Sequence, residues 1–186
     1  MQLEPLTGQH APALLKAGQD ERVWAFITLD GRTAEAMDGY VAGLLSDHAR
    51  GSAMPFAVRA RASGQVVGST RLKNLARPHR SALVGSWYSL AVWGTGVNTE
   101  AKLLLLDYAF EQLRCIRVEF QTDTRNARSR AALTRLGATE EGVLRANQVV
   151  RGGVRRDSAV FSVLDQEWPA VRAGLKARLG ASPTAG

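Results

Sequence analysis

The sequence predicts one α/β (α+β) domain in which helices pack on a single mixed sheet. Apolar residues recur at helical spacing in the first quarter of the chain, whereas alternation of apolar and polar residues begins near Met54 and indicates strands. A strand, helix, strand, helix order follows, before two more strands and a last helix. With 186 residues, 45% of them hydrophobic, the chain can build one sizeable core. We therefore expect one domain over residues 1–180 and a flexible tail of small residues over 181–186.

The N-terminal half contains both patterns. Thr33 stands before a helical segment in which Met37 and Leu44 lie at helical spacing. The pair Ser63-Gly64 is typical of a turn, so the strands on either side of it form a hairpin. The predicted helices lie within residues 8–19 and 35–48. The predicted strands are residues 3–6, 54–61, 66–72 and 82–90.

The C-terminal half places a leucine-rich helix between two strands. Four consecutive leucines, residues 103–106, make this helix apolar on most sides, so we expect it to be buried between the sheet and another element. Gly137 ends a second helix, and Gly152-Gly153 turns the last hairpin. The predicted helices are residues 101–113, 127–136 and 165–179. The predicted strands are residues 117–121, 143–150 and 154–164.

The composition argues against several classes of protein. The 24 Lys and Arg residues outnumber the 17 Asp and Glu residues, and the net charge of +7 favours a polyanionic partner such as nucleic acid or a phosphorylated cofactor. Cys115 is the single cysteine, so a disulfide within the chain is excluded, and with three scattered histidines we expect no metal site. Neither a membrane span nor a secretory signal is recognisable, so we expect a cytoplasmic protein.

A glycine-rich turn before the leucine-rich helix is the most informative segment. The start of a helix has unpaired amides and a partial positive charge, and Gly94 and Gly96 carry no side chains that would keep an anion away. Such a turn alone is more often structural than a phosphate site. The spacing excludes a P-loop, which needs Gly-Lys-Ser/Thr, and a dinucleotide fold, which needs a third glycine and an early strand.

Residues 93–101, Trp-Gly-Thr-Gly-Val-Asn-Thr-Glu-Ala, resemble the acetyl-coenzyme A (acetyl-CoA) loop of the GNAT superfamily of N-acetyltransferases, in its RimJ/RimL-like branch. The resemblance covers the chain from about Leu3 to Leu179 in the order of the family. Its other matching segments are residues 66–71, 117–120, 126–138, 141–145 and 156–157. It implies a GNAT-like domain with a mostly antiparallel mixed sheet, helices on both faces and a central pair of strands that splays apart.

The resemblance also implies which residues bind acetyl-CoA. The backbone of Trp87 to Ser89 is expected to pair with the pantetheine arm, with Tyr88 nearest the acetyl group, and the backbone amides from Gly94 to Thr99 are expected to hold the diphosphate. The general pattern of the loop has Gln or Arg in place of Trp93 and Gly or Ala in place of Asn98, whereas Gly96 matches. The implied cofactor-binding residues are Trp87, Tyr88, Ser89, Trp93, Gly94, Thr95, Gly96, Val97, Asn98, Thr99, Asn126 and Ser129.

Catalysis of this kind needs no enzyme nucleophile, because an amine attacks the thioester directly. The resemblance implies that Asn126 orients the cofactor arm and that Ser129 hydrogen-bonds or protonates the departing sulfur. The alternative is that Asn126 only caps a helix. The usual acidic residue two positions before Gly85 is absent, since Leu83 stands there. The candidate bases that remain are Glu119, Asp123 and Glu141, or a relaying water.

Three functions remain open. The first is an acetyl-CoA-dependent N-acetyltransferase whose amine substrate is a protein N-terminus, for example of a ribosomal protein, or a small molecule. The second is a non-catalytic acyl-CoA-binding protein, and the third, a nucleic-acid-binding domain, rests on charge alone. Residues 24–32 and the last hairpin are expected to select the amine, and an exposed edge of that hairpin to allow a homodimer. Side chains considered for these roles are the aromatic Trp24, Phe26 and Trp87, and the basic Arg125, Arg128, Arg130 and Arg135.

Overall fold

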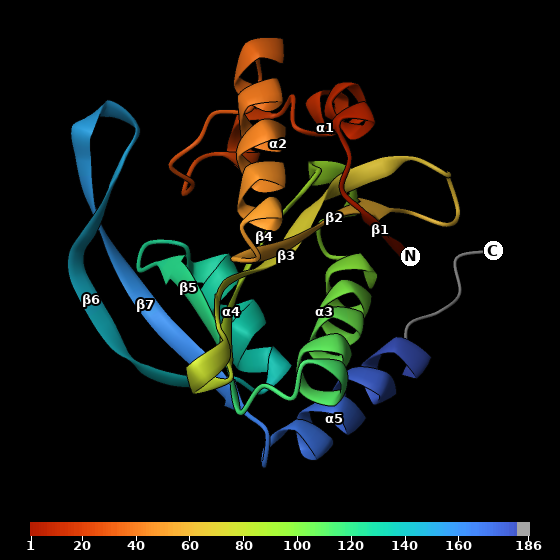
Figure 1. The fold of residues 1–186 in the computed structure, drawn as a ribbon, viewed down its shortest axis with the longest axis vertical. Coiled ribbons are helices and arrows are strands. Elements are labelled where there is room, and N and C mark those ends of the chain that lie inside the picture. The colour runs from red at the N-terminus through yellow and green to blue at the C-terminus, as the bar shows by residue number, and fades with distance from the viewer. Residues whose placement is uncertain (182–186) are drawn as a thin grey trace.

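The computed structural model describes residues 1–181, which form a seven-stranded sheet with helices around it (Figure 1). The strand order is β1-β2-β3-β4-β5-β7-β6, and β4 and β5 form the one parallel pair of this sheet. The strands are β1 Gln2–Pro5, β2 Ala53–Arg59, β3 Val66–Ala76, β4 Ser81–Tyr88, β5 Arg117–Asp123, β6 Thr139–Val150 and β7 Val154–Leu164. The helices are α1 Ala11–Ala17, α2 Ala34–Ala49, α3 Val97–Asp107, α4 Ala127–Leu136 and α5 Trp168–Ala181. The predicted mixed, mostly antiparallel sheet is confirmed.

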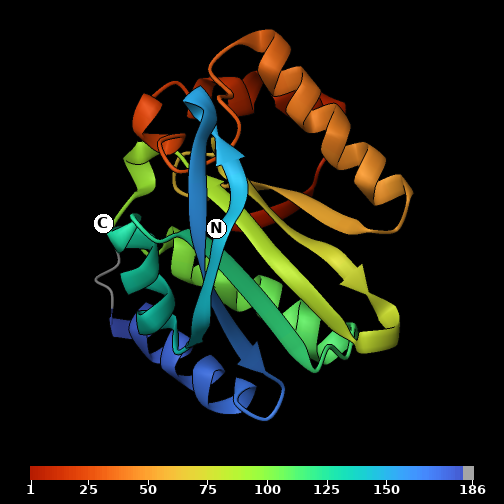
Figure 2. The ribbon, with the colours of Figure 1, turned by 90° about the vertical axis from the view of Figure 1, so that its left-hand side faces the viewer.

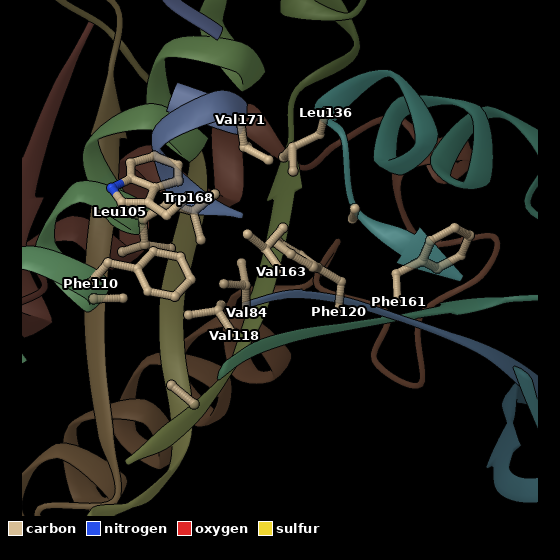
Figure 3. Close-up of a cluster of buried hydrophobic side chains, with 14 of the residues drawn as sticks. Val84, Leu105, Phe110, Val118, Phe120, Leu136, Phe161, Val163, Trp168 and Val171 are labelled. Atoms are coloured by element: carbon tan, nitrogen blue, oxygen red, sulfur yellow. The ribbon is translucent and has the colours of Figure 1, made fainter. Parts of the chain in front are cut away.

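Helices cover both faces of the sheet, as predicted (Figure 2). On one face α3, α4 and α5 bury the larger core, which contains Phe120 of β5, Val163 of β7 and Trp168 of α5 (Figure 3). On the other face α1 and α2 pack against the sheet around Trp24 and Trp87, whose ring centroids lie 4.8 Å apart. The leucine-rich helix is therefore buried as its composition indicates.

The two parallel strands pair only over their first halves. Their register runs from Ser81 opposite Arg117 to Val84 opposite Phe120, whereas both strands continue further. Beyond that last pair β5 stays bonded to β7, but residues 85–88 of β4 have no partner on the β5 side. We call this place the β4–β5 divergence. It confirms the splayed central pair that the family resemblance implies.

Several boundaries differ from the predicted ones. The helix after the glycine-rich turn begins at Val97, four residues early, because the Gly96 carbonyl already accepts the amide of Glu100. It ends in a π-helical turn, Tyr108–Gln112. The last helix begins late, at Trp168, because residues 165–167 form a turn. Its end at Ala181 takes one residue from the predicted tail, and the rest of that tail, 182–186, lies outside the described residues.

The single cysteine and the lengths of the helices complete the description of the fold. Cys115 is buried in the larger core, with 5% of its surface exposed. No helix within residues 1–181 is both long and apolar enough to cross a bilayer.

Candidate functional site

The start of α3 presents free backbone amides beside the glycine-rich turn. Within residues 1–181 the amides of Gly94, Gly96, Asn98 and Thr99 donate no hydrogen bond. Gly94 has a φ of +76°, a conformation that favours glycine, and a Cβ added there would have no atom within 4 Å. An anion can therefore approach these amides, and the helix dipole favours its negative charge.

The indole of Trp93 connects this turn to two neighbouring elements. Its Nε1 donates a hydrogen bond of 2.9 Å to the carbonyl of Tyr88, at the end of β4. The guanidinium of Arg128, in the first turn of α4, stacks on the indole ring with its Cζ 3.1 Å from the ring centroid. The starts of α3 and α4 thus lie against each other, with a cation between them.

The backbone of β4 offers hydrogen-bonding groups at the divergence. Ser89 donates its amide to Val67 of β3 at 2.7 Å, and Trp87 lies opposite Ser69 in the same ladder. Because antiparallel bonds alternate along a strand, the N–H and C=O of Tyr88 point the other way, into the divergence. Of the three residues expected to pair with the pantetheine arm, Tyr88 is therefore the one whose backbone is oriented for it.

Asn126 and Ser129 stand at the start of α4. The side-chain Oδ1 of Asn126 accepts the amide of Ser129 at 3.0 Å, which is a helix cap. The hydroxyl of Ser129 is half-buried and has no hydrogen bond within residues 1–181. The cap that we considered as an alternative is thus present, and it leaves both the Asn126 amide nitrogen and the Ser129 hydroxyl available to a ligand.

Lys102 is the site residue that the sequence reasoning missed. It lies on α3, is 7% exposed, and its Nζ donates to Ser86 Oγ at 2.6 Å, next to the Thr70 hydroxyl 2.6 Å further on. The same Nζ lies 5.7 Å from the ring centroid of Phe120, which belongs to the last bonded pair of β4 and β5. Burial lowers the pKa of Lys102 to about 7. A single lysine next to four leucines was the available signal.

The side chain of Tyr88 lies beside this network. Its hydroxyl is buried and has no hydrogen bond within residues 1–181. Burial raises the pKa of Tyr88 to about 12, and the nearby hydroxyls of Ser86 and Thr70 offset only part of that effect. The phenol therefore stays neutral at physiological pH.

The three predicted bases are each held by a cation. Glu119 and Glu141 both bind Arg117, with a Glu119–Arg117 distance of 2.9 Å. Arg125 binds both carboxylate oxygens of Asp123, at 2.9 and 2.6 Å. These contacts lower the pKa of Glu141 and of Asp123 below their ordinary values, which weakens both carboxylates as bases.

The face of the sheet under α2 carries a different set of groups. Arg71 of β3 lies over Gly85, and its Nη1 donates to the hydroxyl of Tyr40 at 2.9 Å. Trp87 Nε1 donates to the same hydroxyl at 3.2 Å. Trp24 is fully buried and Trp87 is 5% exposed, so these two aromatic side chains belong to the core and do not line a groove.

The basic cluster on and before α4 is divided among different partners. Arg125 pairs with Asp123, and Arg130 with Glu140 at 3.0 Å. Arg128 stacks on Trp93. These three side chains do not form one continuous basic surface, so charge gives little support to nucleic-acid binding.

Comparison with known proteins identifies the family. The model of an acetyltransferase (GNAT) domain matches residues 1–139. The "Putative ribosomal N-acetyltransferase YdaF" of Bacillus subtilis (strain 168) is 36% identical over 105 residues, which are 56% of this chain and 57% of that protein. Two further curated relatives are covered over 62% and 66% of their lengths, so the chain spans less than two thirds of these relatives.

Solved structures match over more of the chain. A GCN5-related N-acetyltransferase from Brucella melitensis is 30% identical with a TM-score of 0.88, covering 97% of this chain and 82% of that one. RimJ of Mycobacterium smegmatis, in complex with CoA-disulfide, is 26% identical with a TM-score of 0.82, covering 96% and 88%.

Proposed function

The chain belongs to the GNAT family of acetyltransferases, and from this we propose that it transfers the acetyl group of acetyl-CoA to an amine. The single observation that supports this most is the β4–β5 divergence with its unpaired edge next to the free amides of α3. A strand edge and a helix start are what an extended arm and a diphosphate respectively require.

The residues present fit acetyl-CoA. The free amides of Gly94, Gly96, Asn98 and Thr99 would hold the diphosphate, with the cation of Arg128 beside them. The backbone of Tyr88 would pair with the pantetheine arm once its carbonyl exchanges the Trp93 indole for the arm. A coenzyme bound in this way supplies a thioester carbonyl that an amine can attack without an enzyme nucleophile. The remaining task of the protein is to orient the partners and move protons.

Two residues are placed for the proton transfers. Ser129, with its free hydroxyl at the start of α4, would donate a hydrogen bond or a proton to the departing sulfur. We propose that Lys102 accepts the proton of the amine. This side chain is buried at the divergence and donates a hydrogen bond to Ser86. With a pKa of about 7, its neutral form can accept a proton at physiological pH, whereas Asp123 and Glu141 are held ionised by arginines.

A non-catalytic acyl-CoA-binding protein of the same fold is the second candidate. The observation that favours it is Leu83, an apolar side chain where the family usually has an acid. Release of free CoA thiol in the presence of a panel of amines separates the two functions. Amine-dependent release supports the transferase, whereas tight binding of acetyl-CoA without release with any amine supports the binding protein.

The family relationship leaves the amine substrate open. The YdaF relative is named for ribosomal N-acetylation, so a peptide N-terminus belongs in the panel together with small amines. The matched variants Gly94→Ala and Gly51→Ala show whether release depends on the α3 amides.

Self-association through the last hairpin remains part of the proposal. β6 is an edge strand of the sheet, and apolar side chains on this hairpin are exposed to solvent. They are Val143, Leu144, Val149 and Val154, between 45% and 62% exposed. Sedimentation of the wild type against a Val149→Lys variant tests it: a dimer that the charge dissociates is expected. A cytoplasmic location likewise stays a prediction.

A further inference from the structure

Three cations lie on the sheet face opposite α3. Arg71 and Lys73 project from β3, and Arg156 from β7. Burial lowers the pKa of Lys73, the charges of Arg71 and Arg156 lower it further, and the carboxylates of Asp47 and Glu119 act in the opposite direction. Arg71 lies opposite Gly85 of β4, and Ser158, two residues after Arg156, lies opposite Asp123 of β5. This face flanks the β4–β5 divergence.

The two guanidiniums lack carboxylate partners. Within residues 1–181 Arg71 makes no salt bridge, and its Nη1 binds only the hydroxyl of Tyr40. Arg156 is 8% exposed, its Nη1 donates to the carbonyl of Phe26 at 3.2 Å, and its Nε has no partner. The carboxylate whose charge acts on Arg156, that of Asp123, is already bound through both oxygens to Arg125. Burying a cation without an anion is costly, so this arrangement is that of an incomplete ion pair.

A second orphaned group lies next to Arg156. The hydroxyl of Ser158 is fully buried and has no hydrogen bond within the described chain. Ser158 and Arg156 are two residues apart on β7, so both side chains point to the α2 face of the sheet. Buried polar atoms without partners are rare in folded proteins. Arg156 Nε and Ser158 Oγ are two such atoms on one strand, and they indicate a ligand that supplies oxygen atoms.

We propose that the amine substrate carries an anionic oxygen group, a carboxylate or a phosphate, which Arg71 and Arg156 bind on the α2 side of the β4–β5 divergence. This inference rests on the proposed transferase function and narrows its substrate class. Arg71 and Arg156 lie on the face opposite α3, so the anionic group would bind on that face while the amine nitrogen enters the divergence, where Lys102 is buried. Guanidinium groups bind both carboxylates and phosphates through paired hydrogen bonds.

The experiment compares amines that differ only in the anion. The pairs are alanine with alaninamide and phosphoethanolamine with ethanolamine, each with acetyl-CoA and with CoA release as the readout. We expect kcat/KM to be at least about tenfold higher for the anionic member of one pair. A preference for alanine over alaninamide would identify the anion as a carboxylate, and a preference for phosphoethanolamine over ethanolamine would identify it as a phosphate. Equal rates within both pairs would overturn the inference and leave the transferase intact.

Variants locate the effect. Arg71→Gln and Arg156→Gln should each raise KM for the anionic amine by about tenfold or more and leave KM for acetyl-CoA unchanged. The kcat/KM values of the two amines in a pair should then become similar. Arg61→Gln, an exposed arginine in the β2–β3 turn, is the matched control for loss of one charge. Unchanged discrimination in both variants would refute the assignment of these arginines. Thermal melts show whether the variants fold. If Arg71→Gln does not fold, Arg71→Lys replaces it, because lysine keeps the charge but not the paired hydrogen bonds of a guanidinium.

A binding measurement separates this inference from the proposed function. Calorimetric titration of the free protein with N-acetylalanine and with N-acetylalaninamide needs no turnover. Binding of the acid alone, abolished in Arg156→Gln, supports the anion site even if acetyl-CoA proves not to bind. Equal binding of the acid and the amide contradicts the inference, and so does failure of both N-acetylalanine and N-acetylphosphoethanolamine to bind at millimolar concentration.

Discussion

The guanidinium of Arg128 stacks on the indole of Trp93, with its Cζ 3.1 Å from the ring centroid. This contact joins the first turn of α4 to the turn before α3 and leaves a positive charge beside the free amides. Arg128→Gln should therefore raise the Kd for acetyl-CoA by about tenfold, because it removes a cation near the bound diphosphate. Lys176→Gln, an exposed lysine on α5, is the control that should leave the Kd unchanged. Titration calorimetry measures both, and an unchanged Kd in Arg128→Gln would show that Arg128 serves only to pack Trp93.

Gly94 and Gly51 offer a matched pair of backbone positions. Their φ values are +76° and +69°, and neither would bring a new Cβ within 4 Å of other atoms. Substitution by alanine should thus cost about 1 kcal/mol of folding stability at either position, from the left-handed conformation alone. Only Gly94→Ala should also weaken acetyl-CoA binding, because its methyl group lies among the free amides. Similar affinities in the two variants would mean that these amides do not hold the diphosphate.

Asn126 combines a helix cap with a proposed role toward the coenzyme, and two substitutions separate them. Asn126→Ala should lower the free energy of unfolding by about 1 kcal/mol, because the Ser129 amide loses its acceptor. Asn126→Asp keeps an oxygen at the cap and should restore stability. If the amide nitrogen orients the cofactor arm, kcat/KM stays low in Asn126→Asp. Recovery of activity together with stability would leave the cap as the whole role of Asn126.

The lowered pKa of Lys102 predicts that the stability of the fold rises with pH above neutrality. Its pKa in the folded protein is about 7, below the ordinary value of 10.5, so between these values the unfolded chain holds a proton that the folded chain has released. Raising the pH from 7 to 9.5 should therefore stabilise the fold, by on the order of 1 kcal/mol per pH unit from this residue. Urea unfolding should show this slope in the wild type and a smaller one in Lys102→Met. Lys16→Met, at an exposed position of α1, should keep the wild-type slope, and equal slopes in all three proteins would contradict the shift.

The same residue predicts a kinetic signature. If Lys102 takes the proton of the amine, kcat of the wild type should rise with pH around a midpoint near 7, since only the neutral form accepts a proton. Lys102→Met should lower kcat by about 10²-fold or more and lose that midpoint, with little change in KM for acetyl-CoA. A pH profile that keeps its midpoint in the variant would assign the proton to another group.

The elements of the fold were predictable where local pattern and tertiary structure agree. Residues 127–136 were placed correctly because Asn126 caps the helix and Gly137, with a φ of +99°, ends it. The start of α3 was predicted four residues late, since no side chain caps it and its first turn depends on the Gly96 carbonyl. Local sequence carries no sign of that bond.

The candidate site was predictable only in part. The glycine-rich turn and Asn126 are adjacent to helix starts, so a linear pattern reveals them. Lys102 and Arg156 acquire their properties from burial by residues distant in the chain, such as Phe26, 130 positions from Arg156. Trp24 shows the converse, because a side chain considered for a groove is fully enclosed by the core of α1 and α2.

Backbone amide NMR during titration with acetyl-CoA tests most directly whether the coenzyme binds at the β4–β5 divergence. The largest shifts are expected at Tyr88 and at residues 94–99, together with the indole N–H of Trp93, which should leave the Tyr88 carbonyl. Saturation at 100 times the Kd should also stabilise the fold by about 3 kcal/mol. Shifts confined to other parts of the molecule, or none at millimolar acetyl-CoA, would contradict binding at this place.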